Sequence, residues 1–205
     1  MLGYLILGIT YAFAAAVQPG PFQTYLISQT LSHGWRSTLP AAFAPLLSDG
    51  PIILLVLLVL SRMPGWLAQS LQCAGGIFLL YLAIGAFKAW RNYQGNNAFE
   101  NHTSRQTVVK AALVNLLNPN PWLAWSLVMG PLLLKGWRET PVNGISLLVG
   151  FYTAMILVTL GIILLFAFAR NLGPRVSRSM VGISAVAMAF FGIFELWQGL
   201  HVFFA

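Results

Sequence analysis

The chain has 205 residues, of which 58% are hydrophobic and only 7% are charged. A soluble domain carries roughly 25% charged residues, so the composition excludes an ordinary soluble protein and indicates one that is embedded in a lipid bilayer. The formal net charge is +7 with only four acidic residues, and basic loops at an anionic membrane surface explain this charge without a nucleic-acid partner.

Six apolar runs follow one another along the chain, and each is long enough for a membrane-crossing helix of about 20 residues. Short connections separate most of them, and one longer polar stretch separates the third run from the fourth. The sequence therefore predicts an all-α integral membrane protein with six transmembrane helices, at 2–28, 37–60, 66–90, 107–134, 143–169 and 179–203.

Three short motifs occur twice, in the same order, in the two halves of the chain. Gln18-Pro19-Gly20-Pro21 corresponds to Asn118-Pro119-Asn120-Pro121, Gly34-Trp35-Arg36 to Gly136-Trp137-Arg138, and Gly85–Trp90 to Gly192–Trp197. Each half holds three helices, an odd number, so the second half must be inverted in the membrane, as in many secondary transporters. We expect two inverted three-helix repeats, 1–90 and 107–205, joined by a cytoplasmic linker at 91–106.

The basic residues are distributed unevenly between the two predicted faces. Most of the eleven Lys and Arg residues lie on the face that includes 91–106, and cytoplasmic loops are enriched in these residues. We therefore expect a multi-pass protein of the plasma (inner) membrane with both termini outside.

Both proline motifs lie inside membrane-length apolar runs. Proline has no backbone N–H and interrupts a helix, so the first and fourth helices are predicted to be broken there. The N-termini of two half-helices that meet near the midplane form a site suited to a carboxylate. The candidate substrate-binding residues are Gln18, Pro19, Gly20, Pro21, Phe22, Tyr25, Asn118, Pro119, Asn120, Pro121, Trp122 and Trp125. The alternative is that these prolines only kink the helices, since Pro and Gly are frequent in membrane helices.

Asp49 lies near the middle of the second predicted span, in Ser48-Asp49-Gly50-Pro51. A charge at the bilayer centre costs at least about 2.5–3.5 kcal/mol on insertion scales, and such residues usually face a cavity. The sequence predicts that Asp49 binds a cation or carries a coupling proton. The alternative is a structural carboxyl that accepts hydrogen bonds from freed backbone groups.

Other chemistry-bearing residues do not form a cluster in the sequence. Cys73 is the single cysteine, and the three histidines fall in predicted loops or the C-terminal tail. We therefore expect no metal site and no cofactor. A nucleophile–base pair is not evident either, so no catalytic residue is assigned and an enzyme is not expected.

Taken together, these motifs resemble the LysE-type amino-acid exporter family over nearly the whole chain. The resemblance rests on Pro19-Gly20-Pro21, the Ser48-Asp49-Gly50 turn, the Gly-rich third helix with Tyr81-Leu82, and the Asn118-Pro119 break. It implies six helices, export of amino acids or similar small solutes, and coupling to an ion or proton gradient. Two positions depart from the family pattern, which often has Asn where this chain has Phe22 and Lys where it has Asn120.

The function predicted from these features is secondary active export of a small zwitterionic or carboxylate solute, most simply an amino acid or a derivative, coupled to a proton or cation gradient. A passive channel and an intramembrane lipid-processing protein are the alternatives. The expected partners are the small-molecule substrate and the lipid bilayer, with a homodimer left open and no nucleic acid.

Overall fold

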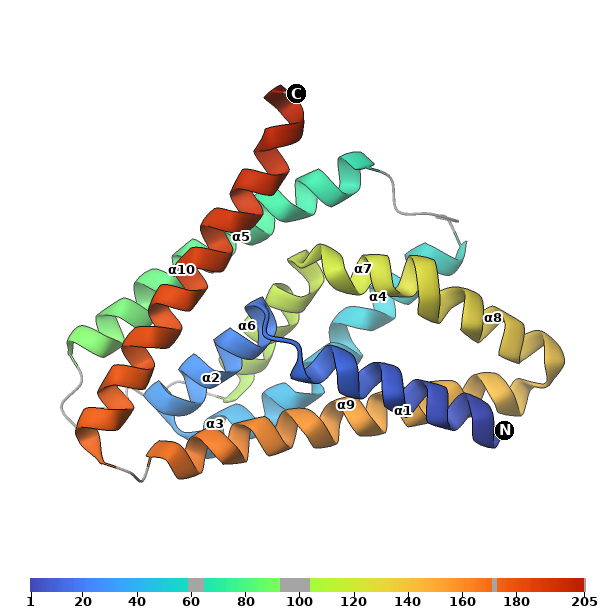
Figure 1. Cartoon of the computed structure of the whole chain (residues 1–205), viewed down its shortest axis with the longest axis horizontal. Coiled ribbons are helices and arrows are strands. Elements are labelled where there is room, and N and C mark those ends of the chain that lie inside the picture. Colours follow the sequence, from blue (N-terminus) through green and yellow to red (C-terminus); the bar gives the residue numbers. More distant parts are fainter. Residues whose placement is uncertain (59–64, 93–103, 171–172, 205) are drawn as a thin grey trace.

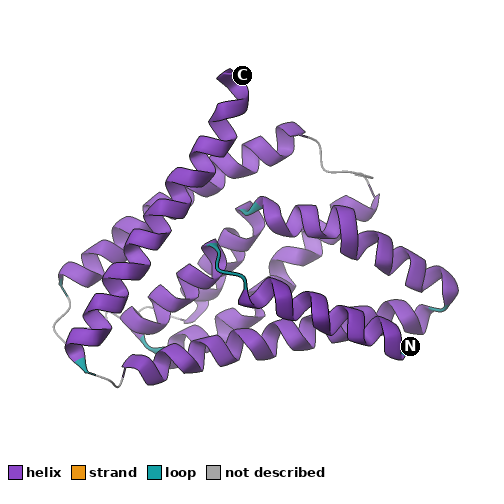
Figure 2. Ribbon diagram, in the orientation of Figure 1, coloured by secondary structure: helices purple, strands orange, loops and turns teal. Residues whose placement is uncertain are grey.

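The computed structural model describes residues 1–58, 65–92, 104–170 and 173–204, and within these ranges every regular element is a helix (Figure 2). The predicted all-α class is therefore confirmed; most of the predicted linker, 93–103, lies outside the described residues. The elements are α1 (Leu2–Val17), α2 (Pro21–His33), α3 (Trp35–Thr38), η1 (Leu39–Phe43), α4 (Ala44–Leu58), α5 (Gly65–Arg91), α6 (Ser104–Leu117), α7 (Pro119–Ala124), η2 (Trp125–Met129), α8 (Gly130–Glu139), α9 (Pro141–Arg170) and α10 (Pro174–Phe204).

Four helical segments among the described residues are long and apolar enough to cross a membrane. They are Trp35–Leu57, Gln69–Arg91, Pro141–Ala169 and Arg175–His201. A fifth span results if α1 and α2, which are bent by 63° at a short break, count as one. The run predicted at 107–134 is not one long helix, because it is divided between α6 and the α7–η2–α8 segment. The structure therefore has a helix boundary at each predicted proline break.

Two pairs of long helices pack side by side, α5 with α10 in antiparallel directions and α1 with α9 in parallel directions (Figure 1). The α5–α10 pair approaches closely at Gly76 and Gly192, and the Gln72 side chain donates a hydrogen bond to Gln198 at 2.8 Å. Gly8 and Gly150 provide the equivalent close approach between α1 and α9. Small residues have this role in membranes because apolar association there depends on close backbone packing.

The buried side chains form two clusters. One involves α2, η1, α5, α6 and α10 and includes Phe22, Tyr25 and Leu26. The other involves α1, α4, α9 and the α7–η2–α8 segment and includes Trp122, Trp125 and Phe151. Phe22 belongs to the first cluster and Trp125 to the second, and both face the cavity described below.

The α1–α9 contact provides a direct test of this packing, because α9 contains a matched pair of glycines. A Cβ added at Gly150 would collide with the backbone carbonyl of Leu5, whereas one added at Gly161 would meet nothing within 4 Å. We expect Gly150→Ala to destabilise the protein by about 1–3 kcal/mol, as overpacking typically does. Gly161→Ala should leave stability unchanged or raise it by about 0.5–1 kcal/mol. Thermal unfolding in detergent measures both; equal midpoints would show that α1 and α9 are not in this contact.

Candidate functional site

The first break satisfies its backbone groups with a side chain. Helix α1 ends at Val17 and is followed by Gln18, whose backbone is extended, and α2 begins at Pro21, where the missing N–H costs nothing. The Gln23 amide reaches back across the break and donates to the Ala16 carbonyl at 3.0 Å. Gly20 precedes α2 without any side-chain cap. The first N–H groups of α2 therefore stay available at the break.

The second break is capped differently. The Asn118 side-chain oxygen accepts a hydrogen bond from the Asn120 N–H at 3.0 Å, which satisfies one of the first donors of α7. The Trp122 indole N–H donates to the Leu116 carbonyl at 2.8 Å, which satisfies an acceptor at the end of α6. The two breaks are thus similar in sequence but differ in how many backbone donors they leave free.

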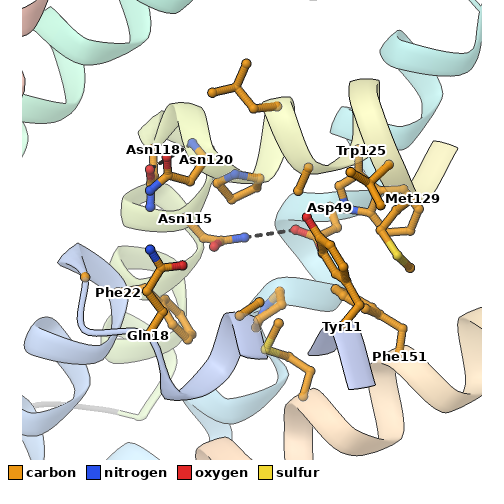
Figure 3. A pocket seen from close by; sticks show the side chains of 18 of the residues that line it. Tyr11, Gln18, Phe22, Asp49, Asn115, Asn118, Asn120, Trp125, Met129 and Phe151 are labelled. Atoms are coloured by element: carbon orange, nitrogen blue, oxygen red, sulfur yellow. Dashed lines mark hydrogen bonds between the residues drawn. The ribbon is translucent and has the colours of Figure 1, made fainter. Parts of the chain in front are cut away.

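Both breaks line one cavity of about 360 Å³, within the range of about 300–1,000 Å³ that is common for small-molecule sites. Figure 3 shows Gln18 and Phe22 from the first break on one side and Asn118 and Asn120 from the second on another. The lining residues are Tyr11, Ala15, Gln18, Pro19, Gly20, Phe22, Gln23, Pro45, Asp49, Asn115, Asn118, Asn120, Pro121, Leu123, Ala124, Trp125, Leu127, Val128, Met129, Phe151 and Met155.

Asp49 lies at the cavity wall and is only 3% exposed. Asn115 donates from its amide nitrogen to the Asp49 carboxyl at 2.9 Å, as Figure 3 shows, and to the Ser48 hydroxyl at 2.7 Å. Tyr152 donates its hydroxyl to the second carboxyl oxygen at 3.4 Å, and the Trp125 indole is a further hydrogen-bonding neighbour. Asp49 is therefore held by neutral donors from three other elements.

The chain near Trp125 has an unusual backbone. Residues Trp125–Met129 form a π-helical turn between α7 and α8, and such turns are rare and occur frequently at functional sites. This turn carries two cavity residues that are almost fully buried, Trp125 and Met129. The second break and the π turn together place Trp125 and Met129 at the same cavity as Asp49.

The described lining of the cavity includes an acidic side chain but no basic one. Among the described residues that line it, Asp49 is the only acid, and there is no Lys, Arg or His. The rest of the polar lining consists of amide side chains, the Tyr11 hydroxyl and free backbone groups near Gly20. A cation or proton at Asp49 would therefore compensate a carboxylate that no basic lining residue neutralises.

Most of the predicted site residues meet at this cavity. Gln18, Pro19, Gly20, Phe22, Asp49, Asn118, Asn120, Pro121 and Trp125 line it. Four predicted residues are not among its lining. Pro21 and Pro119 are buried at the helix starts. Trp122 caps α6, as described above, and Tyr25 is fully buried where α2 packs on α6. Tyr25 and Trp125 occupy corresponding positions in the two motifs, but only Trp125 lines the cavity, because α2 turns the Tyr25 side chain toward the core.

Several lining residues were not selected from the sequence. Tyr11 and Ala15 lie on the face of α1 that leads to Gln18, so helical spacing from the break could have found them. Phe151 and Met155 are also four residues apart, on α9, but nothing in the sequence connects α9 with the breaks. Their assignment required the α1–α9 packing.

A helical membrane protein whose interrupted helices and buried acid enclose a solute-sized polar cavity has the architecture of a membrane transporter. Comparison with protein families agrees: the LysE type translocator model matches residues 13–199, which is most of the chain. The chain therefore belongs to the LysE type translocator family, which confirms the resemblance seen in its motifs. Membership indicates a membrane exporter. Comparison with curated proteins and with solved structures gives no match.

The hydrogen bonds to Asp49 lead to a stability prediction. Asn115→Leu removes the shorter bond and leaves a buried carboxyl short of a donor, so we expect a loss of about 1–3 kcal/mol. Tyr152→Phe removes only the longer bond and should cost less. Unfolding in detergent measures both. If Asp49→Asn in the Asn115→Leu background does not reduce the Asn115→Leu penalty, the two side chains are not coupled.

Proposed function

We propose that this protein is a secondary active exporter of a small zwitterionic or carboxylate solute, most simply an amino acid or a derivative, coupled to a proton or cation gradient. The single observation that carries the proposal is that both helix breaks and the buried Asp49 line the same cavity. Family membership supports export as the direction of transport.

The anionic end of the solute is assigned to the start of α2. The N–H groups of Phe22 and Gln23 have no side-chain cap there, and a helix N-terminus favours negative charge. Asn118 already caps the start of α7, so the second break contributes amide side chains more than free backbone donors. The two breaks therefore have different roles in this proposal, although their sequences correspond.

The cationic end of the solute, or the coupling ion, is assigned to Asp49. Its carboxyl accepts hydrogen bonds from Asn115 and Tyr152 and has no basic partner among the lining residues. A group in this environment can alternate between a bound ammonium and a bound proton, which is the exchange that coupled transport requires.

The inverted repeat remains part of the proposal, and the helix packing supports it. Helices α5 and α10, which carry the corresponding Gly85–Trp90 and Gly192–Trp197 motifs, pack in antiparallel directions, with Cys73 opposite Gly199 and Trp90 opposite Gly182. The α1–α9 contact also has a matching contact, because α6, the proposed counterpart of α1, packs on α4. Antiparallel counterparts are what a two-fold axis in the membrane plane produces.

Alternating access needs a contact that can open, and we assign it to α2 and α6. Tyr25 donates its hydroxyl to the Thr107 carbonyl at 3.5 Å across this contact. The Thr107 hydroxyl on α6 and the Ser28 hydroxyl on α2 are buried with no partner among the described residues, whereas Thr30 on α2 bonds to the Leu26 carbonyl. Each unsatisfied buried hydroxyl costs about 1–3 kcal/mol. Opening the contact to cytoplasmic water would recover that cost, so the closed state is not strongly favoured.

Asp49→Asn tests the coupling role. This change keeps the shape of the side chain and removes the titratable group, so we expect export driven by a pH gradient to fall nearly to the level of protein-free liposomes. Proteoliposomes loaded with a mixture of the common L-amino acids, analysed by mass spectrometry of the released solutes, provide the measurement.

The matched control for Asp49→Asn is Glu139→Gln, which removes an exposed carboxylate at the end of α8 and should transport normally. Wild-type export by Asp49→Asn with unchanged pH dependence would make the carboxyl structural. Flux that needs no gradient in the unmodified protein would favour a passive channel.

Thiol labelling tests the α2–α6 contact in a Cys73→Ser background, because Cys73 is the single native cysteine. Thr107 is 1% exposed, whereas Gln106 beside it on α6 is exposed. We expect a membrane-impermeant maleimide on the cytoplasmic side to label Gln106→Cys at all times and Thr107→Cys only during transport.

Two outcomes of this labelling experiment would contradict the proposal. If Thr107→Cys stays unreactive while transport proceeds, the contact that opens lies elsewhere. If Gln106→Cys reacts only from the outside, the proposed orientation of the protein in the membrane is reversed.

A further inference from the structure

We infer that the exported solute has an uncharged, apolar side chain and that a second cationic group on the solute is selected against. This inference rests on the proposed function and adds the substrate class to it. It follows from the part of the cavity that neither the carboxylate site at α2 nor Asp49 occupies.

That part of the cavity is a wall of aromatic and methionine side chains. Phe151 packs edge-on against Trp125, with ring centroids 5.6 Å apart, and lies 6.4 Å from the Tyr11 ring. Met129, which is fully buried, and Met155 complete the wall. Methionine is flexible and polarisable, so it adapts to apolar groups of different shape. We call these five residues, Tyr11, Trp125, Met129, Phe151 and Met155, the apolar wall.

The charges of the cavity exclude a second ammonium. Asp49 is the only acid among the described lining residues, and a zwitterion with one ammonium group uses it completely. A solute such as lysine would place another ammonium against the apolar wall, where no counter-charge lies. The more exposed lining residues of the α7–η2 segment, Leu123, Leu127 and Val128, are also apolar. An unpaired charge in such surroundings loses its hydration without compensation.

An apolar side chain on the solute gains binding free energy when it is buried against the apolar wall. Burying one methylene group is worth about 0.8 kcal/mol, which corresponds to a change in affinity of about fourfold. Along the unbranched series L-alanine, L-2-aminobutyrate, L-norvaline and L-norleucine, affinity should therefore increase by about fourfold at each step until the wall is covered.

L-Norleucine and L-lysine are the decisive pair of ligands, because they share one unbranched carbon chain and differ by the terminal ammonium. Binding to the purified protein in detergent can be measured by calorimetry at neutral pH. We expect L-norleucine to bind at least about tenfold more tightly than L-lysine, a difference of about 1.4 kcal/mol.

Met155 offers a matched pair of variants for the apolar wall, because it is only half-buried and its side chain is close in length to Glu and Gln. Met155→Glu adds the missing counter-charge, so it should strengthen L-lysine binding and weaken L-norleucine binding. Met155→Gln should weaken L-norleucine binding without any gain for L-lysine. The comparison separates the effect of charge from that of polarity, and near-equal melting temperatures of the two variants verify that both are folded.

The outcomes distinguish this inference from the proposal on which it rests. If L-lysine binds as tightly as L-norleucine to the unmodified protein, the apolar substrate class is wrong, while export of a zwitterion stands. If affinity does not change along the unbranched series, the wall does not contact the side chain and the inference is overturned in the same way. If none of these amino acids binds, the zwitterion proposal fails and the substrate class fails with it.

Discussion

The structure depends on the requirement that every backbone N–H and C=O at membrane depth finds a partner within the protein, because hydrocarbon offers none. Two helices are interrupted here, and each interruption frees donors and acceptors. Gln23 and Trp122 bond to carbonyls left at the ends of α1 and α6, and Asn118 binds an N–H of α7. Phe22 and Gln23, whose N–H groups remain uncapped at the start of α2, line the cavity. The cavity thus borders the irregular backbone of both breaks, and the solute is proposed to act as the partner of the donors that remain free.

The need for a hydrogen-bonding partner applies even more strongly to Asp49, because a carboxyl group can carry a charge. A carboxyl that is 3% exposed needs donors, and Asn115, Tyr152 and Trp125 supply them from α6, α9 and η2. All three are neutral. A basic residue in their place would form a permanent ion pair, and the carboxyl would no longer be able to exchange one cation for another. Neutral donors hold the group in position and, in the proposed mechanism, leave its charge to be compensated by the solute or coupling ion.

In the proposed transport cycle, the contacts that stay closed and the contact that opens lie in different parts of the fold. The α1–α9 and α5–α10 pairs meet through glycines that bring backbones together, and such contacts leave little room for rearrangement. The α2–α6 contact includes Thr107, whose buried hydroxyl has no partner among the described residues, and we propose that this contact costs less to separate. The half-helix α2 belongs to the movable contact and is joined to α1 only through the Gln18–Gly20 break. In this proposal the break has two consequences, since it contributes to the binding site and it allows α2 to move separately from α1.

Composition and the length of the apolar runs were sufficient to predict an all-helical membrane protein, because the bilayer leaves few other ways to satisfy the backbone. The proline motifs located both breaks, since a missing N–H acts within a single turn of helix. Asp49 could be singled out because a charge inside an apolar run is costly wherever that run packs.

The tertiary structure alone decided which faces of these helices meet. Tyr25 and Trp125 occupy corresponding positions in the repeat, yet Tyr25 packs against α6 and Trp125 reaches the cavity. Tyr152, Phe151 and Met155 belong to the site only because α9 packs along α1. In an apolar helix nearly every face is hydrophobic, so the sequence contains no polar stripe to show which face is buried against protein and which faces lipid. Only the close approach of particular glycines and the shape of neighbouring side chains determine it.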